Sequence, residues 1–329
     1  MVRPLVIAAA QLGPVQRADP RALVVERMRA LLRDAHGMGA RLVVFPELAL
    51  TTFFPRWYFE DEAELDAFYE TAMPSPSTQP LFDDARRLGV GFCLGYAERT
   101  EDGHRYNTSI LVDPQGQIAL RYRKVHLPGH AQPEPWRRFQ HLEKRYFEPG
   151  AGFKAVRAFG GVVGMAICND RRWSETYRVL GLLGVELVLI GYNTPVHNPP
   201  APEHDRLGDF HNHLVMQAGA YQNGTWVVGV AKAGCEEGCE MIGGSCIIAP
   251  TGELVAVCST RDDELAVARC DLDLCLSYKR SVFDFAAHRQ PHAYRMIVER
   301  TGAMPPGSSA SAESAESAES ADRDPDQEP

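Results

Sequence analysis

Three reactive side chains stand just after runs of residues that are typical of buried strands. They are Glu47, Lys124 and Cys168, and the runs are residues 42–46, 118–122 and 162–167. In an α/β protein, side chains at the carboxyl end of a buried strand emerge from the sheet into a crevice. A lone charge after a strand usually marks the return to solvent, and a lone cysteine is usually a core thiol. Three different reactive types in matching positions favour a shared reaction site.

If the three side chains meet, their chemistry is complementary. A carboxylate beside a thiol can act as a general base, and the resulting thiolate can attack a carbonyl carbon. A fixed ammonium would then stabilise the oxyanion that forms, an interaction worth about 3–4 kcal/mol in other oxyanion holes. A neighbouring cation also favours the thiolate. This set suits attack on an amide, nitrile or ureido carbon, and we expect it to need no cofactor and no metal.

Two adjacent guanidiniums, Arg171 and Arg172, come directly after this cysteine segment. Arginine holds a carboxylate through two parallel hydrogen bonds, so the pair predicts a substrate that carries a carboxylate. The alternative is that one or both form ion pairs with Asp170 or Glu175. Two polar residues that end the next strand could complete the contacts with the carboxylate or the ureido group: Asn193 and Thr194.

Apolar periodicity and turn signals predict strands that alternate with helices, which indicates an α/β fold with a mixed sheet. The expected strands are residues 5–11, 41–45, 91–97, 106–112, 117–123, 162–167, 185–192, 225–232, 245–249, 253–259 and 265–270. The expected helices begin at Asp19-Pro20 and span about 61–71, 79–88, 174–183 and 204–222. Two similar hairpins, one in each half, suggest internal pseudo-symmetry. The aromatic insertion at 51–76 is long enough to be a functional rim.

Composition narrows the protein class. The chain of 329 residues has a formal net charge of −9 and no basic stripe interleaved with aromatic residues, which argues against nucleic-acid binding. No run approaches the roughly 18 apolar residues of a membrane span, and no signal-peptide pattern precedes residue 5, so we expect a cytoplasmic protein. The eight cysteines are too scattered for a disulfide framework. Cys235 and Cys239 lack the second pair that a zinc site needs.

The end of the chain differs from the rest. From residue 305 it consists of acidic Ser-Ala-Glu repeats without an apolar face, so we predict a disordered tail over 305–329. The folded part is then a single domain over residues 1–304.

Five longer motifs carry a resemblance to a known family. They are residues 44–57, 122–130, 139–150, 167–173 and 191–195. The chain resembles the nitrilase superfamily of carbon–nitrogen hydrolases, whose triad is Glu, Lys and Cys, over roughly residues 5–300. Within it, the motifs at 139–150 and 167–173 are most similar to the N-carbamoyl-D-amino acid amidohydrolases. The resemblance implies a four-layer α-β-β-α sandwich that assembles into homodimers or homotetramers through its helical faces.

The resemblance also implies roles for individual residues. Glu47 would be the general base, Lys124 the oxyanion stabiliser and Cys168 the nucleophile, with Glu143 as a second, structural glutamate beside the lysine. Read without the family, Glu143 could equally be a surface acid next to its basic neighbours. The substrate pocket would be lined by these further residues: His126, His141, Asn169, Arg171, Arg172, Asn193 and Thr194.

The predicted reaction is hydrolysis of an N-carbamoyl-D-amino acid to the D-amino acid, ammonia and carbon dioxide through a covalent thioester. D selectivity follows from the resemblance alone. One alternative is another ureido or amide hydrolase, such as a β-ureidopropionase or an aliphatic amidase. Another is a catalytically silent member of the fold that binds a partner. A metal-dependent hydrolase of the hydantoinase type lacks a convincing cluster of histidine ligands.

Overall fold

Two six-stranded sheets form the centre of the structure, a computed structural model that describes residues 2–198 and 201–306. The first sheet has the order β14-β1-β2-β3-β4-β5 and the second the order β13-β12-β9-β8-β7-β6. The strands are β1 Pro4–Gln11, β2 Leu42–Val44, β3 Gly91–Arg99, β4 Arg105–Val112, β5 Ile118–Arg123, β6 Ala155–Ala158, β7 Gly161–Ile167, β8 Leu187–Tyr192, β9 Trp226–Ala231, β12 Cys246–Ile248, β13 Leu254–Val257 and β14 Glu264–Asp271.

Both sheets are mixed, as predicted, and their pairing patterns match. Strands β1, β2 and β3 run parallel, and antiparallel strands flank them on both sides. Strands β7, β8 and β9 repeat this arrangement in the second sheet, flanked by β6, β12 and β13. The common pattern agrees with the internal pseudo-symmetry that the two hairpins suggested.

Successive side chains along the strands point alternately to the two faces of the sheet, and they pack in two separate apolar cores. In β1, Ile7 and Ala9 pack in the core that includes the second sheet, whereas Ala8 and Ala10 pack against helical residues such as Met28. Successive side chains of a strand point to opposite faces, so a continuous apolar run buries both faces of the first sheet.

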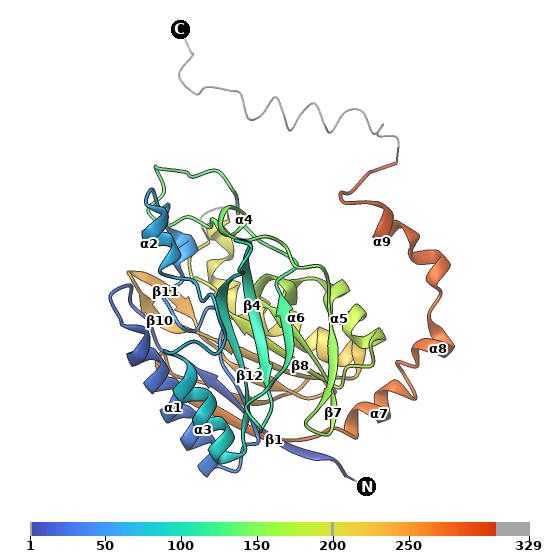
Figure 1. Cartoon of the computed structure of the whole chain (residues 1–329). Coiled ribbons are helices and arrows are strands. Elements are labelled where there is room, and N and C mark those ends of the chain that lie inside the picture. The colour runs from blue at the N-terminus through green and yellow to red at the C-terminus, as the bar shows by residue number, and fades with distance from the viewer. Residues whose placement is uncertain (1, 199–200, 307–329) are drawn as a thin grey trace. The chain divides into compact units, whose positions relative to one another are not determined.

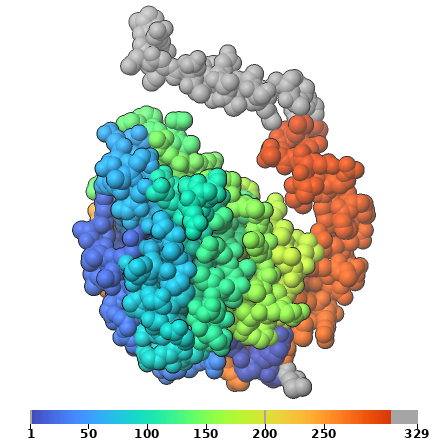
Figure 2. Space-filling model, in the orientation of Figure 1, coloured from blue at the N-terminus to red at the C-terminus, as the bar shows by residue number. Residues whose placement is uncertain are grey.

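Two helices cover the outer face of each sheet (Figure 1). Helices α1 (Arg21–Gly37) and α3 (Gln79–Leu88) pack on the first sheet, and α5 (Ser174–Leu182) and α6 (Gly208–Asn223) pack on the second. The predicted four-layer α-β-β-α sandwich is therefore confirmed. In the space-filling view, the segments coloured from blue to yellow-green form one continuous surface over these layers (Figure 2).

The remaining elements are short. They are the helices α2 Glu62–Asp66, α4 Glu143–Tyr146 and α7 Leu274–Lys279, the 3₁₀ turns η1 Phe54–Arg56, η2 Cys168–Arg172 and η3 Pro202–Leu207, and the hairpin β10 Ala233–Glu236 with β11 Cys239–Ile242. No helix among the described residues is long and apolar enough to cross a bilayer.

The chain divides into two units, residues 1–284 and 285–329. The first unit contains both sheets. The described part of the second unit holds α8 (Phe285–His288), η4 (Pro291–Tyr294) and α9 (Arg295–Glu299), in which no residue is buried. The predicted disordered tail, apart from its first two residues, lies outside the described residues. The predicted domain boundary at residue 304 stays a prediction.

Four sequence predictions of local structure are wrong. The helix expected over about 61–71 is only α2, which ends at Asp66. The helix expected over 204–222 is interrupted, because residues up to Leu207 form a 3₁₀ turn before α6 begins. Asp19 does not cap α1; its carboxylate accepts the amide of Gln16 instead. Residues 233–242, expected to be a loop, form the β10–β11 hairpin around Glu237 and Gly238. Both turn residues have positive φ, which matches the right-handed twist of a two-residue hairpin turn.

The outer helical layer of the second sheet exposes a group of large apolar side chains. Helices α5 and α6 pack side by side, and the exposed residues on or next to them are Val179, Leu182, Leu183, Phe210, Leu214 and Tyr221. Monomeric proteins rarely expose large contiguous apolar patches. The expected assembly through helical faces stays a prediction, and this group of side chains is where we would place the interface.

We predict that the chain forms a homo-oligomer through this face and that Leu183→Glu combined with Leu214→Glu dissociates it, because the new charges would have to be buried in the interface. Light scattering after size-exclusion chromatography should give the monomer mass for this variant and at least twice that mass for the unchanged chain. Val255→Glu, on the exposed strand β13, is the control and should leave the mass unchanged. A monomeric parent chain would contradict the prediction.

Candidate active site

The three reactive residues predicted from the sequence lie together at the carboxyl ends of their strands. Lys124, after β5, donates from Nζ to Glu47 Oε1 at 2.8 Å. Asn193 connects this pair to the cysteine: its amide donates to Glu47 Oε2 at 2.9 Å, and its carbonyl accepts the Cys168 thiol at 3.5 Å. The base and the nucleophile thus contact the same residue, which follows β8.

Cys168 lies in a strained turn that holds its backbone clear of the sheet. Its φ of 46° is in the left-handed region, which side-chain-bearing residues rarely adopt. The following 3₁₀ turn places Arg171 so that Nη1 donates to the Cys168 carbonyl at 2.7 Å. Strained non-glycine residues persist where their surroundings fix them, and they often mark functional sites.

Glu47 is fixed by the close approach of the two sheets. A Cβ atom on Gly191 of β8 would lie 2.4 Å from the Glu47 nitrogen, and one on Gly95 of β3 would lie 2.7 Å from its Cα. Only glycine leaves room for the backbone at these two positions. The carboxylate that follows β2 is therefore held between strands of both sheets.

A buried arrangement of charges surrounds the ammonium. Lys124 Nζ lies 2.6 Å from Glu143 Oε2 as well as 2.8 Å from Glu47 Oε1, and all three side chains are fully buried. Burial alone would lower the pKa of Lys124, but the charges of Glu143 and Glu47 raise it above its usual value. Burial opposes ionisation of Glu143, yet the charge of Lys124 and the hydrogen bond from His141 lower the pKa of that carboxyl. The ammonium is held charged, as an oxyanion stabiliser requires.

The surroundings of the Cys168 thiol favour its protonated form. Burial and then the charge of Glu47 raise its pKa, against the opposite effects of Lys124 and Arg171. A thiol in this state needs a base to become a nucleophile. The carboxylate of Glu47, which contacts Asn193 as the thiol does, is the candidate base.

Asn107 is part of this centre, although its sequence gives no signal of that. Its Nδ2 donates to Glu47 Oε1 at 2.8 Å and lies 3.5 Å from Glu143 Oε2. It belongs to β4, where it stands in the polar run Asn107-Thr108-Ser109. On the other side of Glu143, His141 Nε2 lies 3.0 Å from Oε1.

A second buried carboxylate, Asp170, organises the segment around the cysteine. Its oxygens accept the Tyr122 hydroxyl at 2.6 Å, the Ile167 amide at 3.0 Å, and both the amide and the Nδ1 of His126 at 2.9 and 2.8 Å. Asn169 Nδ2 in turn donates to the His126 carbonyl at 3.2 Å. Sequence reasoning considered Asp170 only as an ion-pair partner for arginine. The structure gives it three other partners.

A cavity of about 330 Å³ opens next to this centre. Four residues predicted to bind substrate line it: His141, Arg171, Arg172 and Thr194. Cys168 does not line the cavity, but Arg171 joins the two, because its Nη1 atom lies 3.8 Å from the sulfur of Cys168. The outer wall includes Val196, His204, Asp205 and His211.

The two adjacent arginines have different surroundings. Arg171 is buried, and it donates to Asn212 Oδ1 at 2.9 Å and to Thr194 Oγ1 at 2.8 Å in addition to the cysteine carbonyl. Arg172 also reaches the cavity, but within the described residues it forms no hydrogen bond or ion pair. Neither arginine pairs with Asp170 or Glu175. Arg172 is therefore the guanidinium that is available to an anion.

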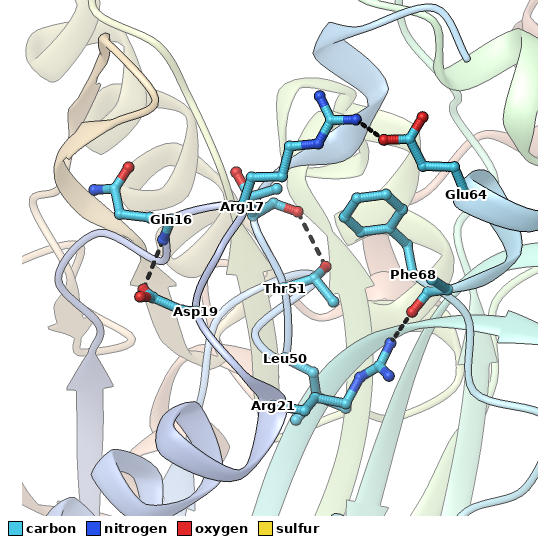
Figure 3. A pocket seen from close by; sticks show the side chains of 10 residues that line it. Gln16, Arg17, Asp19, Arg21, Leu50, Thr51, Glu64 and Phe68 are labelled. Carbon is cyan, nitrogen blue, oxygen red and sulfur yellow. Dashed lines mark hydrogen bonds and ion pairs between the residues drawn. The ribbon is translucent and has the colours of Figure 1, made fainter. Parts of the chain in front are cut away.

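A second cavity, of about 260 Å³, is lined in part by residues 50–52 (Figure 3). The Arg17 guanidinium points across it to the carboxylate of Glu64, and Arg21 donates to the Ala67 carbonyl. None of the predicted catalytic residues lines this cavity, and its two cations already have protein partners. We do not assign the reaction to it.

Comparison with known proteins agrees with this geometry. The sequence model of the carbon-nitrogen hydrolase family matches residues 6–280. An N-carbamoylputrescine amidase of Solanum lycopersicum is 30% identical over 315 residues, which cover 92% of this chain and 98% of that protein.

Two solved structures have a similar fold. A carbon-nitrogen hydrolase of Helicobacter pylori has a TM-score of 0.77 at 21% identity, with 91% of this chain and 99% of that chain covered. Nit3 of Saccharomyces cerevisiae, a member of branch 10 of the nitrilase superfamily, has a TM-score of 0.70 at 20% identity, with 88% and 97% covered. At these identities, the likeness establishes the fold.

We predict that Gly191→Ala destabilises the protein by about 1–3 kcal/mol, because the added methyl group would collide with the Glu47 backbone. Urea denaturation should give a lower midpoint, and activity should fall as the base moves. Gly37→Ala is the matched control, since a Cβ there meets nothing within 4 Å. Equal midpoints for Gly191→Ala and the parent chain would show that the sheets can separate without cost.

We predict that iodoacetamide alkylates Cys168 at pH 7 in a Cys235→Ser background, which removes the exposed thiol. Glu47→Gln should slow this alkylation about 100-fold, because general-base assistance is lost. The difference in alkylation rate between Glu47→Gln and the parent should shrink at high pH. Because the pKa of the Cys168 thiol is raised, the thiolate forms without a base only as the pH rises through that pKa. Peptide mapping by mass spectrometry measures the rate.

Two comparisons complete this experiment. Glu148→Gln removes an exposed carboxylate and should not change the rate. Burial raises the pKa of Cys93 to about 12, so this thiol should react far more slowly. Alkylation of Cys168 as slow as that of Cys93 would instead favour a catalytically silent binding protein.

Proposed function

This chain belongs to the carbon–nitrogen hydrolase family, and from that premise we propose that it hydrolyses N-carbamoyl-D-amino acids to the D-amino acid, ammonia and carbon dioxide. The observation that carries this proposal is Arg172, a guanidinium in the cavity beside Cys168 that has no anionic partner among the described residues. A substrate carboxylate would supply that partner.

The proposed reaction begins with proton transfer. Glu47 takes the proton of the Cys168 thiol, and the thiolate attacks the ureido carbon. The carbonyl electrons move to oxygen, and the ammonium of Lys124 stabilises the resulting oxyanion. When the intermediate collapses, the carbon–nitrogen bond breaks and Glu47 delivers its proton to the departing nitrogen.

A covalent thioester remains on Cys168 after this step. Glu47, again a carboxylate, takes a proton from water, and the hydroxide attacks the thioester carbon. Collapse of the second intermediate releases the thiolate, which regains its proton. The carbamate product decomposes to the amine and carbon dioxide, so one substrate and one water yield the amino acid, ammonia and carbon dioxide, and a second water then hydrates the carbon dioxide to bicarbonate in solution.

Carboxylate recognition divides between the two arginines in this proposal. Arg172 holds the substrate carboxylate directly. Arg171 fixes the cysteine carbonyl and Thr194, and therefore positions the nucleophile relative to the bound acid. His141, on the opposite wall, would contact the ureido group.

N-carbamoylputrescine is a second candidate substrate, because a relative of 30% identity carries that name. Its ammonium would need an anion, and Asp205 lines the cavity. The Asp205 carboxylate, however, already accepts His197 Nδ1 at 2.7 Å and the Asn198 amide at 2.8 Å. Arg172 would repel the ammonium. The charges of the cavity therefore favour the carboxylate.

We predict that ammonia release from a substrate panel is fastest with an N-carbamoyl-D-amino acid. The panel pairs D- and L-N-carbamoyl amino acids and adds β-ureidopropionate, N-carbamoylputrescine and a simple aliphatic amide. Cys168→Ala should release no ammonia from any of them. Faster turnover of N-carbamoylputrescine or of the L series would contradict the proposal.

We expect Arg172→Met to lower kcat/KM for the N-carbamoyl acid about 10- to 100-fold, since a charged hydrogen bond is worth roughly 1.5–3 kcal/mol. The carboxylate is bound in both the ground state and the transition state, so most of the change should appear in KM. The same variant should leave hydrolysis of the uncharged amide within about twofold. Arg269→Met, on the exposed part of β14, is the control. An equal loss on acid and amide would argue against carboxylate binding by Arg172.

A further inference from the structure

We propose that Lys232 and Glu236, a second buried ion pair, are positioning residues that hold His141 and Glu143 in place through the turn at residues 51–56. The pair lies outside the reaction centre, and neither residue lines the cavity. Its influence on the reaction rests on the proposed function of that cavity.

The pair is fully buried and lies beside the strand ends that carry the site. Lys232 follows β9, the neighbour of β8 in the second sheet, and its Nζ lies 3.0 Å from Glu236 Oε1. Both side chains have no exposed surface. Removing two charges from water is expensive, and an apolar pair of similar size would often be at least as stable. A buried pair of this kind is therefore better explained by a geometric requirement than by stability.

Both members of the pair hold the same short turn. Lys232 Nζ donates to the Thr51 carbonyl at 2.5 Å, and Glu236 Oε1 accepts the Phe53 amide at 2.6 Å. The Lys232 ammonium thus holds the Thr51 carbonyl, and the Glu236 carboxylate holds the Phe53 amide two residues further along the chain. The Arg56 guanidinium, at the end of the turn, lies 3.9 Å from the same Glu236 oxygen.

The turn at residues 51–56 also binds the segment that contains His141. The Gln140 amide donates to the Arg56 carbonyl at 2.9 Å, and the Leu142 amide donates to the Pro55 carbonyl at 2.8 Å. These two bonds lie on either side of His141. The ring of Phe53 also packs edge-on against the His141 imidazole, with centroids 5.9 Å apart.

From His141 the connection reaches the reaction centre in two hydrogen bonds. Its Nε2 lies 3.0 Å from Glu143 Oε1, and Glu143 Oε2 accepts from Lys124 at 2.6 Å. A shift of the turn would therefore displace one cavity wall and one partner of the ammonium. The turn at residues 51–56 takes no part in the contacts among Cys168, Glu47 and Asn193. The nucleophile should therefore keep its environment.

The test is the double variant Lys232→Met with Glu236→Gln, which removes both charges of the pair together, while the buried Arg56 loses its ion-pair partner at 3.9 Å. We expect kcat/KM to fall about 100-fold, as for other displacements of about 1 Å remote from the chemistry. The rate of Cys168 alkylation by iodoacetamide should stay within about twofold of the parent rate, because this small reagent does not use the cavity wall. Circular dichroism checks that the variant is folded.

The control is Arg3→Met with Glu186→Gln. This ion pair, at 2.6 Å, is partly buried at the start of β1 and just before β8, away from the strand ends that carry the site. It should keep the parent kcat/KM. Both variants are assayed on whichever panel compound the parent chain hydrolyses best, the simple amide included. If the parent chain hydrolyses no N-carbamoyl acid, the proposed function is contradicted. The two double variants can still be compared on the compound that the parent chain does hydrolyse.

Phe53→Ala tests the same connection downstream of the charges, in case the double variant does not fold. It removes the ring contact with His141 and leaves the ion pair in place. We expect kcat/KM to fall at least about 10-fold with the alkylation rate unchanged. Unchanged kcat/KM in a folded double variant or in Phe53→Ala would overturn the proposal. A fall in alkylation that parallels the fall in kcat/KM would overturn it too, since the pair would then support the whole site rather than position one wall.

Discussion

The site depends on an ammonium that has to stay charged where it has no contact with solvent. Lys124 is fully buried, and two carboxylates lie within 2.8 Å of its Nζ. Loss of one partner from such an arrangement leaves an unpaired buried charge, which costs roughly 3–5 kcal/mol. Glu47 and Glu143 come from distant segments, after β2 and at the start of α4. The charge balance therefore requires the ends of β2 and β5 and the α4 segment to meet at one point.

The rest of the sandwich makes that meeting possible. Apolar side chains fill the space between the sheets, and polar contacts concentrate at the carboxyl ends of the strands. There, Asp170 joins Tyr122 of the first sheet to the turn after β7 of the second, while Gly95 and Gly191 let the backbone of Glu47 fit between strands. Close contact and polar pairing thus occur at the same end of the molecule, beside the cavity.

Some of the site was predictable and some was not, for definite physical reasons. Glu47, Lys124 and Cys168 could be singled out because each is a reactive residue that follows a predicted strand. Asn107 gave no such signal, since a polar residue inside a strand reveals its partners only when the strand is placed. The β10–β11 hairpin was missed because its strands are short and its glycines resemble those of a loop.

The sequence by itself determined the family and the mixed α/β class, because these follow from local periodicity and from motifs that are continuous along the chain. Only the tertiary structure decided which of two adjacent arginines is free. Arg171 and Arg172 are equivalent in sequence, but one turn of 3₁₀ geometry directs Arg171 to Asn212 and Thr194 and leaves Arg172 at the cavity. Partners that lie far apart along the chain are set by packing between sheets, which one-dimensional patterns do not contain.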